Sequence, residues 1–154
     1  MNYPILALDP ATKFGWALSR TLYGVWNLKA KRDESSGMKL LRFENKLSEI
    51  CKSNNIKLVV FERPGGRFKN DIINHSKLQA IIERYCESNG INHKGFSSKE
   101  IKKFATGKGN SGKPLMIKAA QEKLNYPGND DNEADALWLL ELAKEEFKYL
   151  WKPV

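Results

Sequence analysis

Two apolar segments of this chain each run directly into an acidic residue. Residues 5–9 read ILALD and residues 56–62 read IKLVVFE, so the first segment ends at Asp9 and the second at Glu62. Such nearly continuous apolar runs are typical of strands buried on both faces, which occur in parallel sheets covered by helices on each side. Because neighbouring parallel strands end at the same edge of a sheet, the pattern predicts that the two carboxylates lie close together.

The remaining periodicities indicate an α/β protein. Two further strand patterns, at residues 14–19 and 22–28, follow the first and are separated by a short SRT turn. Beyond them we expect helices at 36–53, 70–88, 97–105 and 114–124 and from Asp130 onward, and strands at 56–62 and 90–96. This order predicts a mixed sheet flanked by helices. The chain has no repeats and no long linker, so we expect residues 1–154 to form a single domain.

A third acid stands near the start of the last expected helix. Asp130 and Glu133 have the spacing of a capping box, which places Asp135 about one turn into that helix. Oxygen ligands without Cys or His favour Mg²⁺ or Mn²⁺ over zinc. Three carboxylates around one or two such ions suit phosphodiester hydrolysis, in which one ion activates water and the other stabilises the leaving oxygen.

Each of the three acids also has a purely structural interpretation. Asp9 precedes Pro10 and could simply form a turn. Glu62 precedes Arg63 and could form a local ion pair, and Asp135 could be a first-turn acid favoured by the helix dipole. Spacing along the sequence leaves these alternatives open.

The net charge of +8 is concentrated in one stretch of the chain. Residues 63–118 hold twelve Lys and Arg against four Asp and Glu, whereas the rest of the chain is balanced at fourteen of each. A contiguous basic segment is expected of a surface that faces a polyanion such as nucleic acid, and a solvated Lys-rich face is the alternative. Within this segment, residues 106–113 read TGKGNSGK, a Gly- and Lys-rich loop.

Composition narrows the class of protein. Hydrophobic residues make up 41% of the chain and charged residues 29%, as in globular proteins. No apolar run reaches the roughly 18 residues that span a bilayer, and the first residues lack a signal-peptide pattern, so we expect a cytoplasmic protein without membrane association. Cys51 and Cys86 lack ligand spacing to each other or to His75 and His93, which predicts two buried thiols and structural or solvated histidines.

Taken together, four segments resemble the RuvC-type Holliday junction resolvases of the ribonuclease H-like superfamily, most of all the compact versions encoded by phages and other viruses. The segments are ILALDPATKFGWAL, LVVFERP, KKFATGKGNSGK and DNEADALWL. The resemblance implies a five-stranded ribonuclease H-like sheet in the order 3-2-1-4-5, with strand two antiparallel to its neighbours. It also implies a homodimer that makes paired nicks across four-way DNA junctions with Mg²⁺ or Mn²⁺, without a small-molecule cofactor. Such an enzyme would serve recombination, repair or phage DNA processing in a bacterial or virus-infected cell.

The same resemblance implies roles for individual residues. The three acids would bind two metal ions and take part in catalysis. Lys113 matches the loop lysine that approaches the scissile phosphate, where a cation can stabilise charge on the phosphoryl oxygens. The family usually carries an acid three residues before the final Asp, where this chain has Asn132, next to Asp131. Both positions lie one helical turn from Asp135, so either side chain could be a fourth ligand.

The basic stretch supplies candidate contacts with DNA. In RPGGRFKN, residues 63–70, Gly65 and Gly66 permit close approach of the backbone. Phe68 could stack on an opened base, as an aromatic residue near this position does in the family, or it could pack beneath the loop. The expected DNA-binding residues are Arg63, Arg67, Phe68, Lys69, Lys102, Lys103, Lys108 and Lys113.

Three other functions are compatible with parts of the sequence. A ribonuclease H-like nuclease for flaps, other branched DNA or structured RNA, such as the YqgF-type enzymes, would share the fold and the first segment. A catalytically weak junction-binding module would keep the basic face. An actin-like kinase is suggested only by LDPATKFGWAL, and 154 residues leave no room for its second domain and second phosphate loop.

Overall fold

The expected order of helices and strands is present in the computed structural model, which describes residues 3–11, 13–66 and 68–151. The elements are β1 (Ile5–Asp9), β2 (Lys13–Ser19), β3 (Leu22–Asn27), α1 (Gly37–Ser53), β4 (Leu58–Glu62), α2 (Lys69–Asn89), β5 (Asn92–Phe96), α3 (Ser98–Thr106), α4 (Lys113–Leu124), α5 (Asp131–Glu146) and a 3-10 turn, η1 (Lys148–Trp151). The largest boundary differences are at β4 and β5, which begin two residues later than the sequence pattern indicates.

The five strands form one sheet in the order β3-β2-β1-β4-β5. Strand β2 is antiparallel to β1 and β3, whereas β1, β4 and β5 run parallel. In the β1–β4 pair, Ile5 lies beside Leu58 and Leu8 beside Phe61. This register brings the last residues of the two strands, Asp9 and Glu62, to the same level of the sheet. The predicted fold class and strand order are therefore confirmed.

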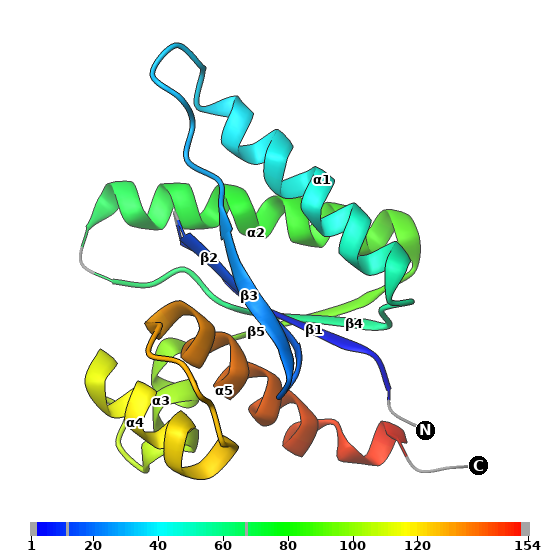
Figure 1. The fold of residues 1–154 in the computed structure, drawn as a ribbon. Coiled ribbons are helices and arrows are strands. Elements are labelled where there is room, and N and C mark those ends of the chain that lie inside the picture. The colour runs from blue at the N-terminus through cyan, green and yellow to red at the C-terminus, as the bar shows by residue number, and fades with distance from the viewer. Residues whose placement is uncertain (1–2, 12, 67, 152–154) are drawn as a thin grey trace.

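Helices cover both faces of the sheet (Figure 1), with α1 and α2 on one face and α3, α4 and α5 on the other. Side chains alternate along each strand, so Leu6 and Leu8 pack toward α1 and α2, while Ile5 and Ala7 pack toward α5. The two cysteines are buried free thiols, as expected. None of the helices in the described part of the chain is both long and apolar enough to cross a membrane.

Helix α5 lies very close to the sheet because small residues line their contact. Ala7 and Ala17 on the strands and Ala134 on the helix belong to one fully buried cluster. Gly15 of β2 makes the closest approach, since a Cβ atom there would lie 2.2 Å from the backbone oxygen of Asn132. The first turn of α5 therefore rests directly on β2, beside the end of β1.

Side-chain hydrogen bonds cap the starts of α3 and α5, and the capping box expected at α5 is present only in part. Ser97 forms a complete capping box with Glu100. At α5, the Asp130 carboxylate accepts a bond from the Glu133 backbone N–H (3.0 Å), but the Glu133 carboxylate instead accepts one from the Tyr126 hydroxyl (2.7 Å). That hydroxyl also accepts a hydrogen bond from the Asp130 backbone N–H. In a complete capping box this N–H would donate to the Glu133 carboxylate. The prediction of a capping box is therefore wrong for the bond between the Asp130 N–H and the Glu133 carboxylate.

Candidate active site

The first two predicted acids meet at one edge of the sheet. Asp9 is the last residue of β1 and Glu62 the last of β4, and these strands are parallel neighbours. Asp9 is only 6% exposed, and its carboxyl group shares a hydrogen bond with that of Glu62. The buried strands thus deliver two carboxylates to one point, as their sequence pattern predicts.

The third acid reaches the same point from α5. A small cleft is lined by all three acids together with Lys102 and several neighbours, namely Asp9, Glu62, Ser98, Ile101, Lys102, Met116, Asp135 and Leu139. Asp135 faces this cleft because the first turn of α5 rests on Gly15. Three acids that are far apart in the sequence therefore form one carboxylate cluster.

This carboxylate cluster is short of positive charge. Burial raises the pKa of Asp9 well above its usual range, and the charges of Asp135 and Glu62 raise it further. Burial, followed by the charges of Glu62 and Asp131, raises the pKa of Asp135 to about 7, although Lys102 and Lys113 oppose this. Buried carboxylates that repel one another are stabilised by a cation placed between them.

Of the two candidates for a fourth ligand, Asp131 is the better placed. Its charge contributes to the raised pKa of both Asp9 and Asp135. Asn132, by contrast, uses its backbone to contact β2 at Gly15. This arrangement favours Asp131 as the fourth acid of the cluster.

The donor set of the cluster fits a hard divalent cation such as Mg²⁺ or Mn²⁺, because it offers carboxylate oxygens without Cys or His. Within residues 3–11, 13–66 and 68–151, no three His, Cys, Asp or Glu side chains already stand in a metal-binding arrangement. Binding of one ion by all three acids would therefore require their side chains to turn toward it.

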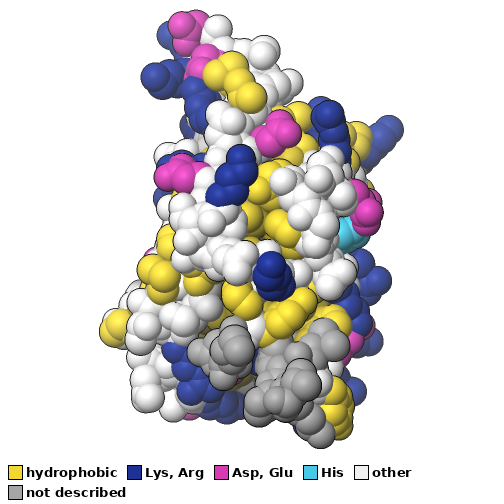
Figure 2. Space-filling model, turned by 90° about the vertical axis from the view of Figure 1, so that its right-hand side faces the viewer, with side chains coloured by type: hydrophobic (Ala, Val, Ile, Leu, Met, Phe, Trp, Pro, Cys, Tyr) yellow, Lys and Arg dark blue, Asp and Glu magenta, His cyan; other side chains and the backbone are white. Residues whose placement is uncertain are grey.

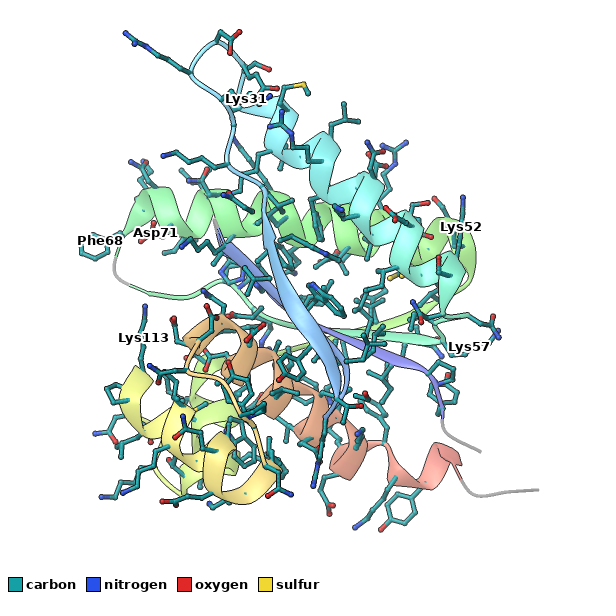
Figure 3. All side chains as sticks on the ribbon, in the orientation of Figure 1. Lys31, Lys52, Lys57, Phe68, Asp71 and Lys113 are labelled. Carbon is teal, nitrogen blue, oxygen red and sulfur yellow. The ribbon has the colours of Figure 1, made fainter. Side chains whose placement is uncertain are left out.

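Lys113 begins α4 and lies at the rim of the carboxylate cluster. Its side chain is 78% exposed, and its Nζ atom is 3.1 Å from the Asp131 carboxylate. That hydrogen bond is the main cause of a raised pKa for Lys113, to which the charges of Asp135 and Asp9 add. Figure 3 shows Lys113 and Phe68 at the same end of the molecule. An exposed cation beside the acids can reach a phosphate that approaches from solvent.

The other predicted DNA contacts are divided between two faces of α3 and the nearby loops. Lys102 lines the carboxylate cleft, whereas Lys103 lines a separate hollow beside Phe104 and Glu146. Three more of the predicted contacts, Arg63, Lys69 and Lys108, are exposed. Arg67 lies outside the described residues. On the face turned away from Lys113, basic side chains are interspersed with acidic and hydrophobic ones (Figure 2).

Phe68 does not pack beneath its loop, which was the structural alternative for this residue. It precedes the first residue of α2, and 70% of it is exposed. His75 and His93 have structural partners, since His75 Nε2 is 2.9 Å from the Glu62 backbone oxygen and His93 bonds to Glu87. A freely exposed aromatic ring beside the site remains available to stack on a base.

Sequence reasoning missed the residues that fix the basic loop. The Ser111 side chain is buried and donates to the Lys108 backbone oxygen (2.8 Å), while the Thr106 hydroxyl bonds to Ser111 and accepts the Lys108 N–H (3.2 Å). Gly15 was also missed, although a glycine inside a strand pattern is a recognised signal of close backbone approach. For the Ser–Thr pair, the loop sequence carries no comparable signal.

No protein-family model and no curated protein sequence matches this chain. Solved structures do match. Thermus thermophilus RuvC in complex with a Holliday junction substrate gives a TM-score of 0.71 at 15% identity, covering 90% of each chain. A second Thermus thermophilus RuvC structure gives 0.68 at 13% identity over 96% of each chain. The yeast mitochondrial Holliday junction resolvase Ydc2 gives 0.56 at 14% identity, covering 96% of this chain and 87% of that one.

The sheet order and its flanking helices define a ribonuclease H-like fold. Within that fold class, the chain has the fold of the RuvC-type Holliday junction resolvases. The resemblance carried by the four sequence segments is confirmed at this level.

Proposed function

We propose that this protein is a divalent-metal-dependent endonuclease that cuts four-way DNA junctions by phosphodiester hydrolysis. The observation that carries the proposal is the convergence of Asp9, Glu62 and Asp135 on one cleft, at the edge of a RuvC-like sheet. The basic stretch around that edge suits a DNA backbone, so affinity for DNA should fall steeply as salt rises.

In this proposal the carboxylate cluster would hold two Mg²⁺ or Mn²⁺ ions through Asp9, Glu62 and Asp135, with Asp131 as the fourth acid. Bound divalent ions would supply Lewis-acid activation of water and of the scissile phosphate. The residues of the chain itself would position the ions and the phosphate. The strands and α5 bring the carboxylates to one cleft, and Lys102 and Lys113 place positive charge where the phosphate must sit.

We also propose that the protein acts as a homodimer, because paired nicks across a four-way junction need two active sites. The neighbour solved with a Holliday junction substrate supports junction DNA as the substrate class for this fold. Exposed Phe68 and Lys113 at one end of the molecule are suitably placed to contact an opened junction.

A panel of labelled substrates tests this function. Four-way junctions, flaps, linear duplexes and structured RNA are incubated with the protein in Mg²⁺ or in a chelator. We expect paired nicks in the four-way junction only when Mg²⁺ is present. Preferential cleavage of flaps or RNA would instead make the protein a different ribonuclease H-like nuclease. Junction binding without products, with or without Mg²⁺, would make it a binding module.

A further inference from the structure

The protruding loop, residues 28–36 between β3 and α1, leaves the sheet at the same edge as the carboxylate cluster. Strand β2 is antiparallel to both β1 and β3, so β1 and β3 end at one edge. Asp9 lies beside Gly15, and Asn27, the last residue of β3, lies beside Lys13. Because Lys13 is two residues nearer to that edge than Gly15, β3 extends about 7 Å beyond Asp9. Figure 1 shows the loop projecting from there past the start of α1.

The protruding loop presents three exposed cations, Lys29, Lys31 and Arg32. None of them has an acidic side chain within ion-pair distance in the described part of the chain. Lys13, beside the base of the loop, is exposed as well. The edge of the sheet that carries the acids therefore has a second basic element, on the side of α1 and α2.

The sequence hides this charge, because Asp33 and Glu34 directly follow the cations. In the structure, the Glu34 carboxylate is used within the protein: it accepts a hydrogen bond from the Lys31 backbone N–H (2.7 Å) and pairs with Arg42 of α1. The Glu34 backbone N–H donates to the Lys31 backbone oxygen (3.0 Å), which closes a β-turn with Arg32 and Asp33 at its tip. Of the two acids in the loop, only Asp33 is left to offset the exposed cations.

Positive charge continues from the loop toward the active site through Lys39, in the first turn of α1. Lys39 is half-buried, and burial lowers the pKa of its ammonium group. Its charge acts on His75, whose pKa is lowered by burial and further by Lys39, against the effect of Glu62. His75 and Glu62 line an open groove of about 990 Å³ beside the carboxylate cleft. A partly desolvated cation is stabilised when an anion approaches it.

We propose that the protruding loop binds the sugar-phosphate backbone of a duplex arm of the DNA substrate, an inference that rests on the proposed nuclease function. Lys29, Lys31 and Arg32 contact phosphates, which position a protein on DNA without reading its sequence. The loop contains no aromatic residue on which an unpaired base could stack. The cleft thus receives the reacting strand, while the loop holds an arm on the side of α1 and α2.

The first test removes the charges of the loop. Binding of a fluorescent four-way junction is measured by anisotropy in a chelator, over a range of salt concentrations. The triple variant Lys29→Gln, Lys31→Gln, Arg32→Gln should bind at least about 10-fold more weakly at low salt, and its slope of log affinity against log salt should become shallower by about 2–3. The charge-keeping triple Lys29→Arg, Lys31→Arg, Arg32→Lys should retain the wild-type slope.

A matched triple, Lys46→Gln, Lys52→Gln, Lys57→Gln, removes the same net charge from exposed positions elsewhere. Figure 3 shows Lys52 and Lys57 at the end of the molecule opposite Lys113. We expect this control to bind junctions within about 2-fold of the wild type, because charges that distant from the DNA are screened by salt. Single-turnover nicking by the loop triple at saturating protein should stay within about 3-fold of the wild type, since the loop does not touch the reacting phosphate.

A second test locates the contact on the DNA. Neutral methylphosphonate linkages replace single phosphates along each arm of the junction. At positions under the loop, the neutral linkage should weaken binding of the wild type but not of the loop triple, because both changes remove the same contact. Losses that simply add at every position overturn the inference.

The remaining outcomes separate the loop contact from the proposed function. Equal salt slopes for the loop triple and the Lys46, Lys52, Lys57 control overturn the loop contact. A changed oligomeric state of the loop triple in size-exclusion chromatography makes the loop a contact between two copies of the chain, and the inference also fails. A wild type that binds junctions without cutting them contradicts the nuclease function alone, and the salt slopes still decide the loop contact. A wild type that does not bind junctions overturns both.

Discussion

The two faces of the sheet are packed in different ways, and only one of them creates a site. Toward α1 and α2 the sheet presents bulky side chains such as Phe14, which stacks on Phe43, and Phe61, which belongs to the same apolar core. Toward α5 it presents larger residues such as Ile5 and Val60 together with Ala7, Ala17 and the bare backbone of Gly15, and Gly15 lies against the first turn of the helix. Bulky residues hold helices away from a sheet, whereas small ones let a helix come close.

This difference explains why the third acid joins the other two. If the α5 face were as bulky as the opposite face, the first turn of α5 would stand farther from the end of β1, and Asp135 with it. The small residues on this face thus pack less volume, but they let Asp135 join the other two acids in a buried carboxylate cluster.

The largest contrast should come from one acid on each face. Glu62→Gln should lower the rate of junction nicking by roughly 10²–10³-fold, the loss typical when one charge-stabilising group leaves an active site. Glu44→Gln, an exposed acid on α1, should leave the rate unchanged. Single-turnover nicking in Mg²⁺ measures both. Equal nicking rates for the two variants would contradict the placement of the active site on the α5 face.

A smaller contrast should come from the packing itself. Gly15→Ala forces a Cβ atom against the Asn132 backbone oxygen, so α5 must shift, and we expect nicking to slow about 10-fold with about 1–3 kcal/mol of destabilisation. Ile82→Val, in the core under α2, should cost about 1 kcal/mol of stability and leave nicking unchanged. Denaturant unfolding and nicking rates are measured on the same preparations. A Gly15→Ala enzyme that is destabilised but fully active would contradict the packing account.

The smallest expected effect is a dependence of stability on pH in metal-free protein. Because the pKa of Asp135 is raised to about 7 in the folded state, the folded protein binds more protons than the unfolded chain between about pH 4 and pH 7. The free energy of unfolding should therefore fall by about 1–2 kcal/mol as pH rises through this range. Asp135→Asn should flatten that slope in urea titrations. A slope that is unchanged in the variant would show that Asp135 is not strained by its neighbours.

Much of this arrangement could be predicted from the sequence because it depends on local patterns. The unbroken apolar runs before Asp9 and Glu62 indicated buried parallel strands, and buried parallel strands place their ends together. The helical periodicities and the Asp130 cap of α5 likewise depend on spacing along the chain. These features carry their own signal because each is determined by neighbours in sequence.

The rest depended on contacts between distant residues. The sequence left Asp131 and Asn132 equivalent, and the contact of α5 with Gly15 is what sets them apart. The Glu133 cap was wrong because Tyr126, seven residues earlier, takes the partner that the local pattern assigned to it. The groove beside the carboxylate cleft is lined by the end of β4 and the loop after it, by one face of α2 and by the start of α3, so no single segment reveals it.

The decisive measurement on this site asks whether acids from β1 and α5 act as one centre. Junction nicking in Mg²⁺ is measured for the wild type, Asp9→Asn, Asp135→Asn and the double variant. Residues that act as a unit have non-additive effects, so each single change should cost about 100-fold or more and the double variant little beyond that. Losses that multiply in the double variant, or an Asp135→Asn protein that cuts at the wild-type rate, would show that Asp9 and Asp135 do not belong to one centre.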